Sequence, residues 1–406
     1  MLTLDKVYHA ALTLKDVARR TDLIAAPRLS DTSKLYLKTE NLQITGSFKL
    51  RGAYYKISQL SEEERAKGVI ACSAGNHAQG VALAATHMGI KSIVCMPASA
   101  PIMKVESTKK LGAQVELVPG AYDDAHDRAV ELQQQTGMTF IHPYDDELVI
   151  AGQGSIGLEI LEQLPDVDAV IVPIGGGGLI SGVAFAIKTL KPSVKIYGVQ
   201  ASGAASMFNA FHDHTYETLD HVCTFADGIA VKTPGETTFK MIEQYVDDII
   251  TVSEDEIAAA ILSLIENQKL IAEGAGATPV AAALFGNLPI ESKKTVCLIS
   301  GGNIDVNILS RVITRGQIMS GRKVNLTVAL DDKPGQLVSV CSIVSNCGAN
   351  IIGVHHDRIN AGAAITGCFL KLSLETRDNA QIEQIKSALH NAGFKLIKEK
   401  NINSCV

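Results

Sequence analysis

The stretch AVIVPIGGGGLISG, residues 169–182, decides the fold. Its first six residues are apolar and mostly β-branched, as in a buried strand, and a helical pattern opens after the glycines. Four consecutive glycines remove every side chain from the turn, so an anion can rest on bare amides at the positive end of a helix. A dinucleotide site is the rival interpretation, but GxGxxG spacing is missing and the next strand ends at Gln200 rather than at an acid. We therefore expect a lone phosphate, with a flexible loop as the plain alternative.

Outward from this stretch, short apolar runs alternate with segments of helical period over about residues 69–300. This alternation is typical of an α/β fold with twisted, mostly parallel sheets that helices cover. Residues 122–136 form one expected helix, and Gly137 ends it. The expected strands are residues 69–72, 92–97, 114–119, 139–143, 169–174, 195–200 and 295–300.

The chain changes character near Thr314, where a polar, glycine-containing segment indicates a domain boundary. After it the expected order is strand, helix, strand, strand, helix, strand, which is the ferredoxin-like βαββαβ arrangement. We expect its first helix to open at Pro334 and to close at Gly348. The strands are expected at residues 324–330, 349–358, 364–374 and 394–400, and the second helix at residues 378–393.

Composition excludes several classes of partner. With 406 residues, 46% of them hydrophobic, and a formal net charge of -6, the chain has material for two or three domains but no basic cluster for nucleic acid. The eight cysteines form no CxxC pair and mostly sit in apolar runs, as free thiols do in a reducing compartment. Neither a signal peptide nor a membrane-spanning stretch is evident. We expect a cytoplasmic protein with neither a nucleic acid nor a membrane partner.

The segment TGSFKLRGA, residues 45–53, contains a candidate reactive lysine. Ser47 can cap a helix, and Lys49 then lies at the margin of its apolar stripe, in line with Ala53, so that the amine can point inward. A desolvated lysine has a lowered pKa and becomes a nucleophile toward a carbonyl cofactor. Read alone, however, the segment favours a surface lysine whose stem covers apolar side chains.

Two further segments follow expected strands. CSAGNHAQG, residues 72–80, opens a helix, so that the amides of residues 73–76 converge on a point that suits a carboxylate or phosphate. From there Asn76 and His77 can reach a ring hydroxyl or a substrate, and a plain helix cap with a hydrogen-bonded histidine is the alternative. ISGGNID, residues 299–305, places the hydroxyl of Ser300 where it can meet a heteroatom or serve as an ordinary turn residue.

The segments SFKLRGA, SAGNHAQG, GGGGL and SGGN, in this order, resemble the fold type II pyridoxal phosphate enzymes, and within them the threonine dehydratases, or threonine ammonia-lyases. The resemblance covers roughly residues 5–315. It implies a two-domain, tryptophan-synthase-β-like fold with pyridoxal 5'-phosphate bound to Lys49 as a Schiff base, which reverses the preference for a surface lysine. The implied cofactor contacts are Phe48 beside the ring, Asn76 at the ring hydroxyl, Ser300 at the pyridine nitrogen, and Gly175, Gly176, Gly177, Gly178 and Leu179 at the phosphate. The implied contacts to the substrate carboxylate are Ser73, Ala74, Gly75, Asn76 and His77.

The same resemblance implies the reaction. L-Threonine would lose water and ammonia to give 2-oxobutanoate, and L-serine would give pyruvate, by α,β-elimination with Lys49 as the base. A hydroxyl at Ser300, in place of an acid, makes the ring a weaker electron sink. Serine racemases of this fold carry a serine at the position of Ala74 and bind a divalent cation through carboxylates at the positions of Gln200 and Ser206. We therefore expect little racemisation and no metal, while a serine racemase or a β-replacement synthase stays the alternative.

Domain boundaries also follow from the resemblance. It implies a large domain of residues 1–51 and 151–315, a small inserted α/β domain of residues 52–150, and a linker of residues 316–323. Glu273 and Asp227 match positions that line the cleft between the two domains, and a helix-capping role is open for either.

Residues 324–406 resemble an ACT domain, with DDKPGQL as its ligand loop. The resemblance implies allosteric control by an amino acid, such as isoleucine or valine in a biosynthetic enzyme, and a homodimer or homotetramer. A subunit-pairing platform without a ligand is the alternative, because folds do not fix function. A non-catalytic amino-acid sensor is the alternative from another class.

Overall fold

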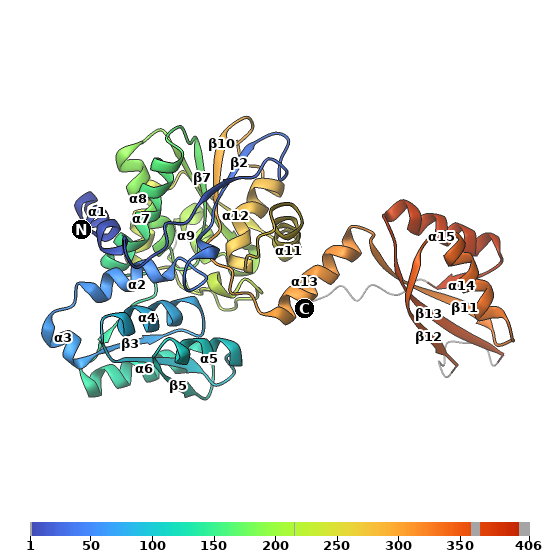
Figure 1. Ribbon diagram of the computed structural model, residues 1–406, viewed down its shortest axis with the longest axis horizontal. Coiled ribbons are helices and arrows are strands. Elements are labelled where there is room, and N and C mark those ends of the chain that lie inside the picture. Colours follow the sequence, from blue (N-terminus) through green and yellow to red (C-terminus); the bar gives the residue numbers. More distant parts are fainter. Residues whose placement is uncertain (1, 215, 359–365, 398–406) are drawn as a thin grey trace. The chain divides into compact units, whose positions relative to one another are not determined.

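The computed structural model describes residues 2–214, 216–358 and 366–397. The chain divides into two compact units, Met1–Ile308 and Leu309–Val406, whose elements are labelled in Figure 1. Among the described residues, no helix has both the length and the apolar character needed to cross a membrane. The cysteines in this part of the chain are free thiols, of which Cys72, Cys95, Cys297 and Cys368 are buried and Cys223 is exposed. Cys405 lies outside the described residues.

The first unit contains a six-stranded sheet with the order β1-β2-β10-β7-β8-β9. Neighbouring strands run parallel, except that β1 and β2 are antiparallel. Three expected strands are confirmed as β7 (Ala169–Pro173), β8 (Lys195–Ala201) and β10 (Lys294–Leu298). The sequence analysis did not include β1 (Leu23–Ala25), β2 (Lys34–Lys38) or β9 (Asp248–Val252), none of which is buried along its whole length as β7 is.

Helices cover both faces of this sheet. Every residue of β7 is buried, which requires a cover on each side. In Figure 1, α7 (Glu147–Gln163) and α8 (Gly178–Leu190) lie on one side, and α11 (Glu254–Ser263) and α12 (Gly274–Phe285) on the other. Ile160, Val172 and Val183 belong to the core between the sheet and the first pair of helices. The remaining helices of this part are α1 (Leu4–Leu14), α9 (Ser206–Asp213) and α10 (Glu236–Tyr245).

A second, four-stranded sheet has the order β5-β4-β3-β6, with all strands parallel. It confirms four expected strands as β3 (Val69–Cys72), β4 (Ser92–Pro97), β5 (Gln114–Val118) and β6 (Thr139–Phe140), the last shorter than expected. The accompanying helices are α2 (Lys49–Ser58), α3 (Glu62–Lys67), α4 (Asn76–His87), α5 (Ile102–Lys110) and α6 (Tyr122–Thr136). Gly137 ends α6 as expected, with a φ of 70° that glycine adopts readily. The exact boundaries of the inserted domain stay a prediction.

The second unit contains an antiparallel sheet with the order β12-β13-β11-β14. Its elements are β11 (Lys323–Asp331), α14 (Gln336–Asn346), β12 (Asn350–Asp357), β13 (Gly367–Glu375), α15 (Asn379–Asn391) and β14 (Lys395–Ile397). Val328, Leu370 and Ile385 are fully buried in its core. The antiparallel sheet is compatible with the expected ferredoxin-like arrangement. Residues 364–365 and 398–400 of the expected strands lie outside the described residues.

Two expected details of this region differ in the structure. The first helix opens at Gln336, after Gly335 with a φ of 90°, and not at Pro334. Residues 316–319, expected in a linker, form the last turn of α13 (Val306–Met319). Met319 lies seven residues after the buried Val312, so the helical period of apolar residues continues past residue 315.

Candidate active site

A cavity of about 730 Å³ lies beyond the carboxyl ends of β3, β7 and β10. Ligands commonly bind at this edge of parallel sheets because loops and helix N-termini converge there. The segments that follow the three strands line the cavity, together with the start of α2. The structure brings together all the site residues expected from the sequence, namely Phe48, Lys49, Ser73, Ala74, Gly75, Asn76, His77, Gly175, Gly176, Gly177, Gly178, Leu179 and Ser300.

The start of α2 differs from the expectation at Ser47. The helix begins at Lys49 with Phe48 in the N-cap position, and the buried hydroxyl of Ser47 has no hydrogen-bond partner among the described residues. The backbone of this segment instead pairs with the loop after β10. Ser47 forms an isolated bridge with Gly301, and the amide of Phe48 donates to the carbonyl of Ser300 at 3.0 Å. Extended pairing therefore replaces the expected cap and fixes Lys49 next to Ser300.

The amine of Lys49 lies inside the cavity. Its Nζ donates a hydrogen bond to the carbonyl of Pro143 at 2.7 Å and lies 5.3 Å from the centroid of the Phe48 ring. Burial lowers the pKa of Lys49 to about 8, against the attraction of the Glu273 carboxylate. A large fraction of the amine is therefore neutral near pH 8, and only the neutral amine can act as a nucleophile or a base.

The glycine loop between β7 and α8 has no room for side chains. A Cβ on Gly176 would lie closer than 3.0 Å to the ring of Tyr144, and one on Gly177 would lie 2.8 Å from the side chain of Thr238. Gly177 also has a φ of 93°, in the left-handed region. Thr238 holds the loop by donating from Oγ1 to the carbonyl of Gly176 at 2.6 Å. The result is a rigid turn with bare amides at the N-terminus of α8, which suits an anion.

Tyr144 belongs to a short segment that also fixes the start of α10. The carboxylate of Asp145 accepts hydrogen bonds from the amides of Thr237 and Thr238, each at 3.0 Å. Residues 143–145 thus contact Lys49, the glycine loop and α10 in succession.

The loop after β3 begins α4 as expected. Gly75 is the N-cap residue, and its amide donates to the hydroxyl of Ser73 at 3.1 Å. The imidazole of His77 is buried, with Nε2 2.8 Å from the carbonyl of Ile141, while Nδ1 has no partner among the described residues. Burial, and secondarily the charge of Lys49, lower the pKa of His77 to about 3. This side chain is a neutral donor to the backbone, as in the alternative considered from the sequence.

Asn76 connects the two sheets through its side-chain amide. Its Nδ2 donates to the Glu273 carboxylate at 2.6 Å, and its Oδ1 accepts a hydrogen bond from Asn303 at 2.8 Å. Burial and the nearby Asp227 raise the pKa of Glu273 to about 7. Glu273 precedes α12 as its N-cap residue but makes no capping hydrogen bond. Its carboxylate therefore serves the cavity rather than the helix.

Lys104 of α5 forms an ion pair with Asp227, which opens the short 3₁₀ helix Asp227–Ile229. Both residues line the cavity. Because α5 flanks the small sheet, this pair joins the two parts of the first unit beside the site.

Ser300 is the second residue after β10, which ends at Leu298, and its side chain is only 2% exposed. Gln200 and Ser206, the positions at which the resemblance implies carboxylates in serine racemases, form hydrogen bonds within the protein. Gln200 Oε1 accepts from the amide of Phe208 at 2.7 Å, and the hydroxyl of Ser206 donates to the carbonyl of Val231 at 2.9 Å.

Residues 14–302 match the family model described as "Pyridoxal-phosphate dependent enzyme". The chain belongs to this family. The match covers more than half of the chain. It contains three of the four segments that meet at the cavity in full, and the fourth as far as Gly302. The protein is therefore a pyridoxal phosphate-dependent enzyme.

Individual members of the family show high similarity to this enzyme. A protein of Thermotoga maritima named L-threonine ammonia-lyase is 49% identical over 398 residues, which cover 98% of this chain and 99% of that protein. The structure of processed threonine deaminase isoform 2 from Solanum lycopersicum has a TM-score of 0.73 and 41% identity, and covers 77% of this chain and 92% of its own. The structure of maize serine racemase has a TM-score of 0.74 and 34% identity, and covers 78% of this chain and 98% of its own.

The residues of the cavity fit pyridoxal phosphate on two observations. The loop of residues 175–178 offers main-chain amides at a helix N-terminus and excludes side chains, as a phosphate group requires. Lys49 offers a buried amine with a lowered pKa in the same cavity, as an aldehyde requires.

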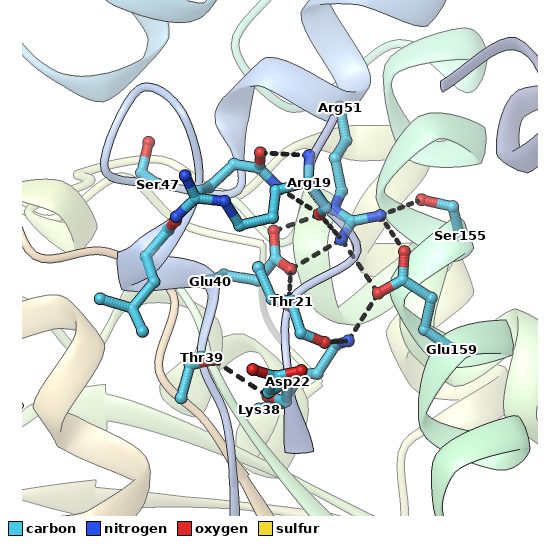
Figure 2. Close-up of polar contacts among 12 residues, drawn as sticks. Arg19, Thr21, Asp22, Lys38, Thr39, Glu40, Ser47, Arg51, Ser155 and Glu159 are labelled. Atoms are coloured by element: carbon cyan, nitrogen blue, oxygen red, sulfur yellow. Dashed lines mark hydrogen bonds and ion pairs between the residues drawn. The ribbon is translucent and has the colours of Figure 1, made fainter. Parts of the chain in front are cut away.

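A network of charged side chains fixes the start of α2 through Arg51. Figure 2 shows Arg51, two residues after Lys49, between two carboxylates. Arg51 donates from Nε and Nη2 to Glu40 at 2.9 and 2.8 Å and from Nη1 to Glu159 at 2.6 Å, and Lys38 donates to Glu159 at 2.5 Å. Although burial opposes ionisation, the charge of Arg51 holds the pKa of Glu40 below its ordinary value. Two cations and two carboxylates thus balance inside the protein and join α2, α7 and the end of β2.

Sequence reasoning missed Asn303, Lys104 and Tyr144 as residues of the site. Asn303 was part of the SGGN segment, so its amide was a usable signal. Lys104 and Tyr144 lie in segments without a recognisable motif, and the fold brings them to the cavity.

Proposed function

We propose that this enzyme is an L-threonine ammonia-lyase, which converts L-threonine to 2-oxobutanoate and ammonia and also accepts L-serine, giving pyruvate. The observation that carries the proposal is the cavity that joins Lys49, the glycine loop and the start of α4. Similarity to the T. maritima protein over nearly the whole chain supports the assignment of the substrate.

The roles we assign to the residues follow from their placement. The amides of residues 175–178, with Leu179, bind the phosphate, and Phe48 packs beside the ring. Asn76 has a second Nδ2 hydrogen, besides the one it gives to Glu273, and we assign it to the ring hydroxyl. Ser300, a neutral hydroxyl, faces the pyridine nitrogen. Pyridoxal phosphate supplies the aldehyde that captures the amine and the ring that acidifies Cα.

Lys49 is the proposed base. Its pKa, lowered to about 8, increases the fraction of neutral amine that can take the Cα proton. We assign the substrate carboxylate to residues 73–77 at the start of α4, where the helix dipole favours a negative charge. With the carboxylate held there, the Cα hydrogen would face Lys49, and the β-hydroxyl would take a proton from the cofactor phosphate and leave as water. Water would then release ammonia from the resulting imine and give 2-oxobutanoate.

Serine racemisation is the second candidate, favoured by the likeness to maize serine racemase. Ala74 lies in the loop that begins α4 and has no hydroxyl with which to protonate the opposite face of Cα. The residue at this position therefore favours elimination.

The C-terminal unit is, in our proposal, an ACT domain with a ferredoxin-like fold that binds an amino-acid effector. A groove of about 470 Å³ between α14 and β12 is lined by Leu337, Val338, Cys341, Ser342, Ser345, Asn346 and Ile351. It begins at the end of the DDKPGQL segment, which supports this segment as the ligand loop. Exposed apolar residues of β12, including Ile352 and Val354, support pairing into a homodimer or homotetramer in the cytoplasm.

The test of the catalytic proposal compares two rates in the purified, cofactor-loaded enzyme. Release of 2-oxobutanoate from L-threonine is measured beside exchange of the Cα hydrogen for deuterium in L-serine. We expect keto-acid release to dominate, and exchange into D-serine without keto acid would establish the racemase instead.

The test of the regulatory proposal repeats the threonine assay with and without isoleucine or valine. Removing residues 324–406 should leave turnover intact and abolish the response to the amino acid. Inhibition that persists unchanged in the shortened chain would contradict an effector site in this unit.

A further inference from the structure

Three side chains with metal-binding atoms meet at one end of the antiparallel sheet in the C-terminal unit. Asp332 follows β11, His356 lies on β12 and Cys368 lies on β13. One ligand atom from each lies within 4.8 Å of the other two, and His356 Nε2 is 3.0 Å from Cys368 Sγ. Asp332 and His356 are exposed, while Cys368 is buried.

The register of the sheet explains why these three side chains share one face. Cys368 pairs with Leu330 on β11, and His356 pairs with Leu370, two residues after Cys368 on β13. Side chains two residues apart point to the same face of a strand, so His356 and Cys368 are diagonal neighbours on the face that carries the buried leucines.

Asp332 joins this face by the same rule. It lies two residues after Leu330, and its amide still donates to the carbonyl of Thr366 at 2.9 Å, which continues the pairing beyond β11. The cluster is therefore fixed by main-chain pairing of three strands rather than by the free rotation of surface side chains.

We propose that Asp332, His356 and Cys368 form a binding site for a divalent ion of the zinc class. A thiolate, an imidazole and a carboxylate are the ligands that Zn²⁺ takes, whereas Mg²⁺ and Ca²⁺ prefer oxygen alone. Three protein ligands leave the fourth tetrahedral position for water or a small ligand. Binding replaces the thiol proton of Cys368 by the metal and releases that proton to solvent.

This site differs in place from the racemase cation site. The absence of a metal that we expected from the sequence concerned Gln200 and Ser206 in the first unit, whereas Asp332 is the second residue of the proposed ligand loop, DDKPGQL. An ion here would join that loop to β12 and β13.

Arg358 competes for the same carboxylate. Its Nη2 donates to Asp332 Oδ1 at 2.8 Å, so a bound cation would have to displace or face a guanidinium. Arg358→Gln should therefore tighten metal binding by about two- to fivefold, the range that an exposed ion pair can supply. A residue that merely supports the local fold would not give an increase.

The experiment uses the full-length, cofactor-loaded enzyme, reduced with a phosphine, freed of metal by a chelator and titrated with Zn²⁺ in a calorimeter. We expect one ion per chain. Binding should weaken by at least about 100-fold in Cys368→Ser and His356→Gln, because loss of outer partners alone costs roughly 10–100-fold. Titration with Co²⁺ should give the visible bands of tetrahedral cobalt, at wavelengths where the cofactor does not absorb.

Two matched controls separate the site from general metal binding. His355→Gln changes the neighbouring histidine, whose side chain faces the other side of β12, and Cys341→Ser changes a half-buried thiol of α14. Both should bind Zn²⁺ like the parent protein. No binding by the parent, equal binding by His356→Gln, or weaker binding by Arg358→Gln would overturn the proposal. His356 is exposed, so its variant decides the question even if Cys368→Ser fails to fold.

Discussion

The side-chain amide of Asn76 donates a hydrogen bond of 2.6 Å to the carboxylate of Glu273. Asn76 begins the helix after β3 of the small sheet, whereas Glu273 precedes α12 beside the large sheet. One short bond therefore connects the two halves of the first unit inside the cavity. Because burial raises the pKa of this carboxyl group to about 7, its charge changes close to physiological pH.

Glu273→Gln should change how stability depends on pH. A raised pKa means that the folded chain binds the proton more tightly, so the stabilisation is complete below the ordinary pKa of 4.5 and is lost as pH rises through about 7. The linkage across this interval is about 3 kcal/mol. Urea unfolding of the cofactor-free protein at several pH values should show the parent losing stability relative to the variant between those limits. Parallel profiles would contradict the shift, and Glu291→Gln, at an exposed site, is the control.

Lys49→Ala should abolish both turnover and covalent attachment of the cofactor. Loss of a positioned base alone lowers the rate by roughly 10²–10⁴-fold, and loss of the nucleophile removes the cofactor linkage as well. Borohydride reduction followed by peptide mass spectrometry should place the label on Lys49 in the parent. Lys110→Ala, at the exposed end of α5, should keep the label and the activity. A labelled peptide elsewhere in the parent protein would disprove the assignment.

Gly176→Ala should weaken cofactor binding. Its Cβ would overlap the Tyr144 ring, and the strain of such overpacking is about 1–3 kcal/mol. The dissociation constant of pyridoxal phosphate, followed by fluorescence, should rise by about tenfold or more. Gly175→Ala is the milder control. Its Cβ would lie 3.1 Å from Cα of Ile229, so its neighbours would have to move less than the Tyr144 ring. An equal effect of both substitutions would exclude the clash with Tyr144 as the cause.

Arg51→Met should destabilise the first unit by about 3–5 kcal/mol, because it leaves the buried carboxylate of Glu40 and the partly buried carboxylate of Glu159 without their shared cation. Arg20→Met breaks an exposed ion pair with Glu162 and should cost less than about 1 kcal/mol. Unfolding midpoints in urea compare the two variants directly. A similar small loss in both would mean that the network does not support α2.

Local sequence patterns predicted the elements whose formation depends mainly on neighbouring residues in the chain. The apolar run before the glycines and the period of α6 specify β7 and that helix without any distant contact. The loops that follow β7 and β10 lie at one edge because these strands are parallel neighbours in one sheet. The loop after β3 belongs to the other sheet, and its assignment to the same site rested on the family resemblance.

The remaining features depend on contacts between distant segments. Lys38 and Glu40 look like surface residues in the sequence, but both are buried. Glu159 and Arg51 balance their charges, and Thr21 forms a hydrogen bond with each of them. Serine is a common helix-capping residue, but the backbone of Ser47 pairs with Gly301 in an isolated bridge, and Ser47 does not cap α2. No local sequence pattern predicts the buried charge network or the bridge between Ser47 and Gly301.

The carbonyl of Pro143 holds the amine of Lys49 only while that amine is free. Covalent attachment of the cofactor removes hydrogens from the nitrogen, so Pro143 loses its donor when the enzyme is loaded. The next residue, Tyr144, covers Gly176 of the proposed phosphate loop, and Asp145 holds the first amides of α10. Residues 143–145 should therefore respond to cofactor loading, and amide hydrogen exchange at Tyr144 and Asp145 should distinguish the empty enzyme from the loaded one.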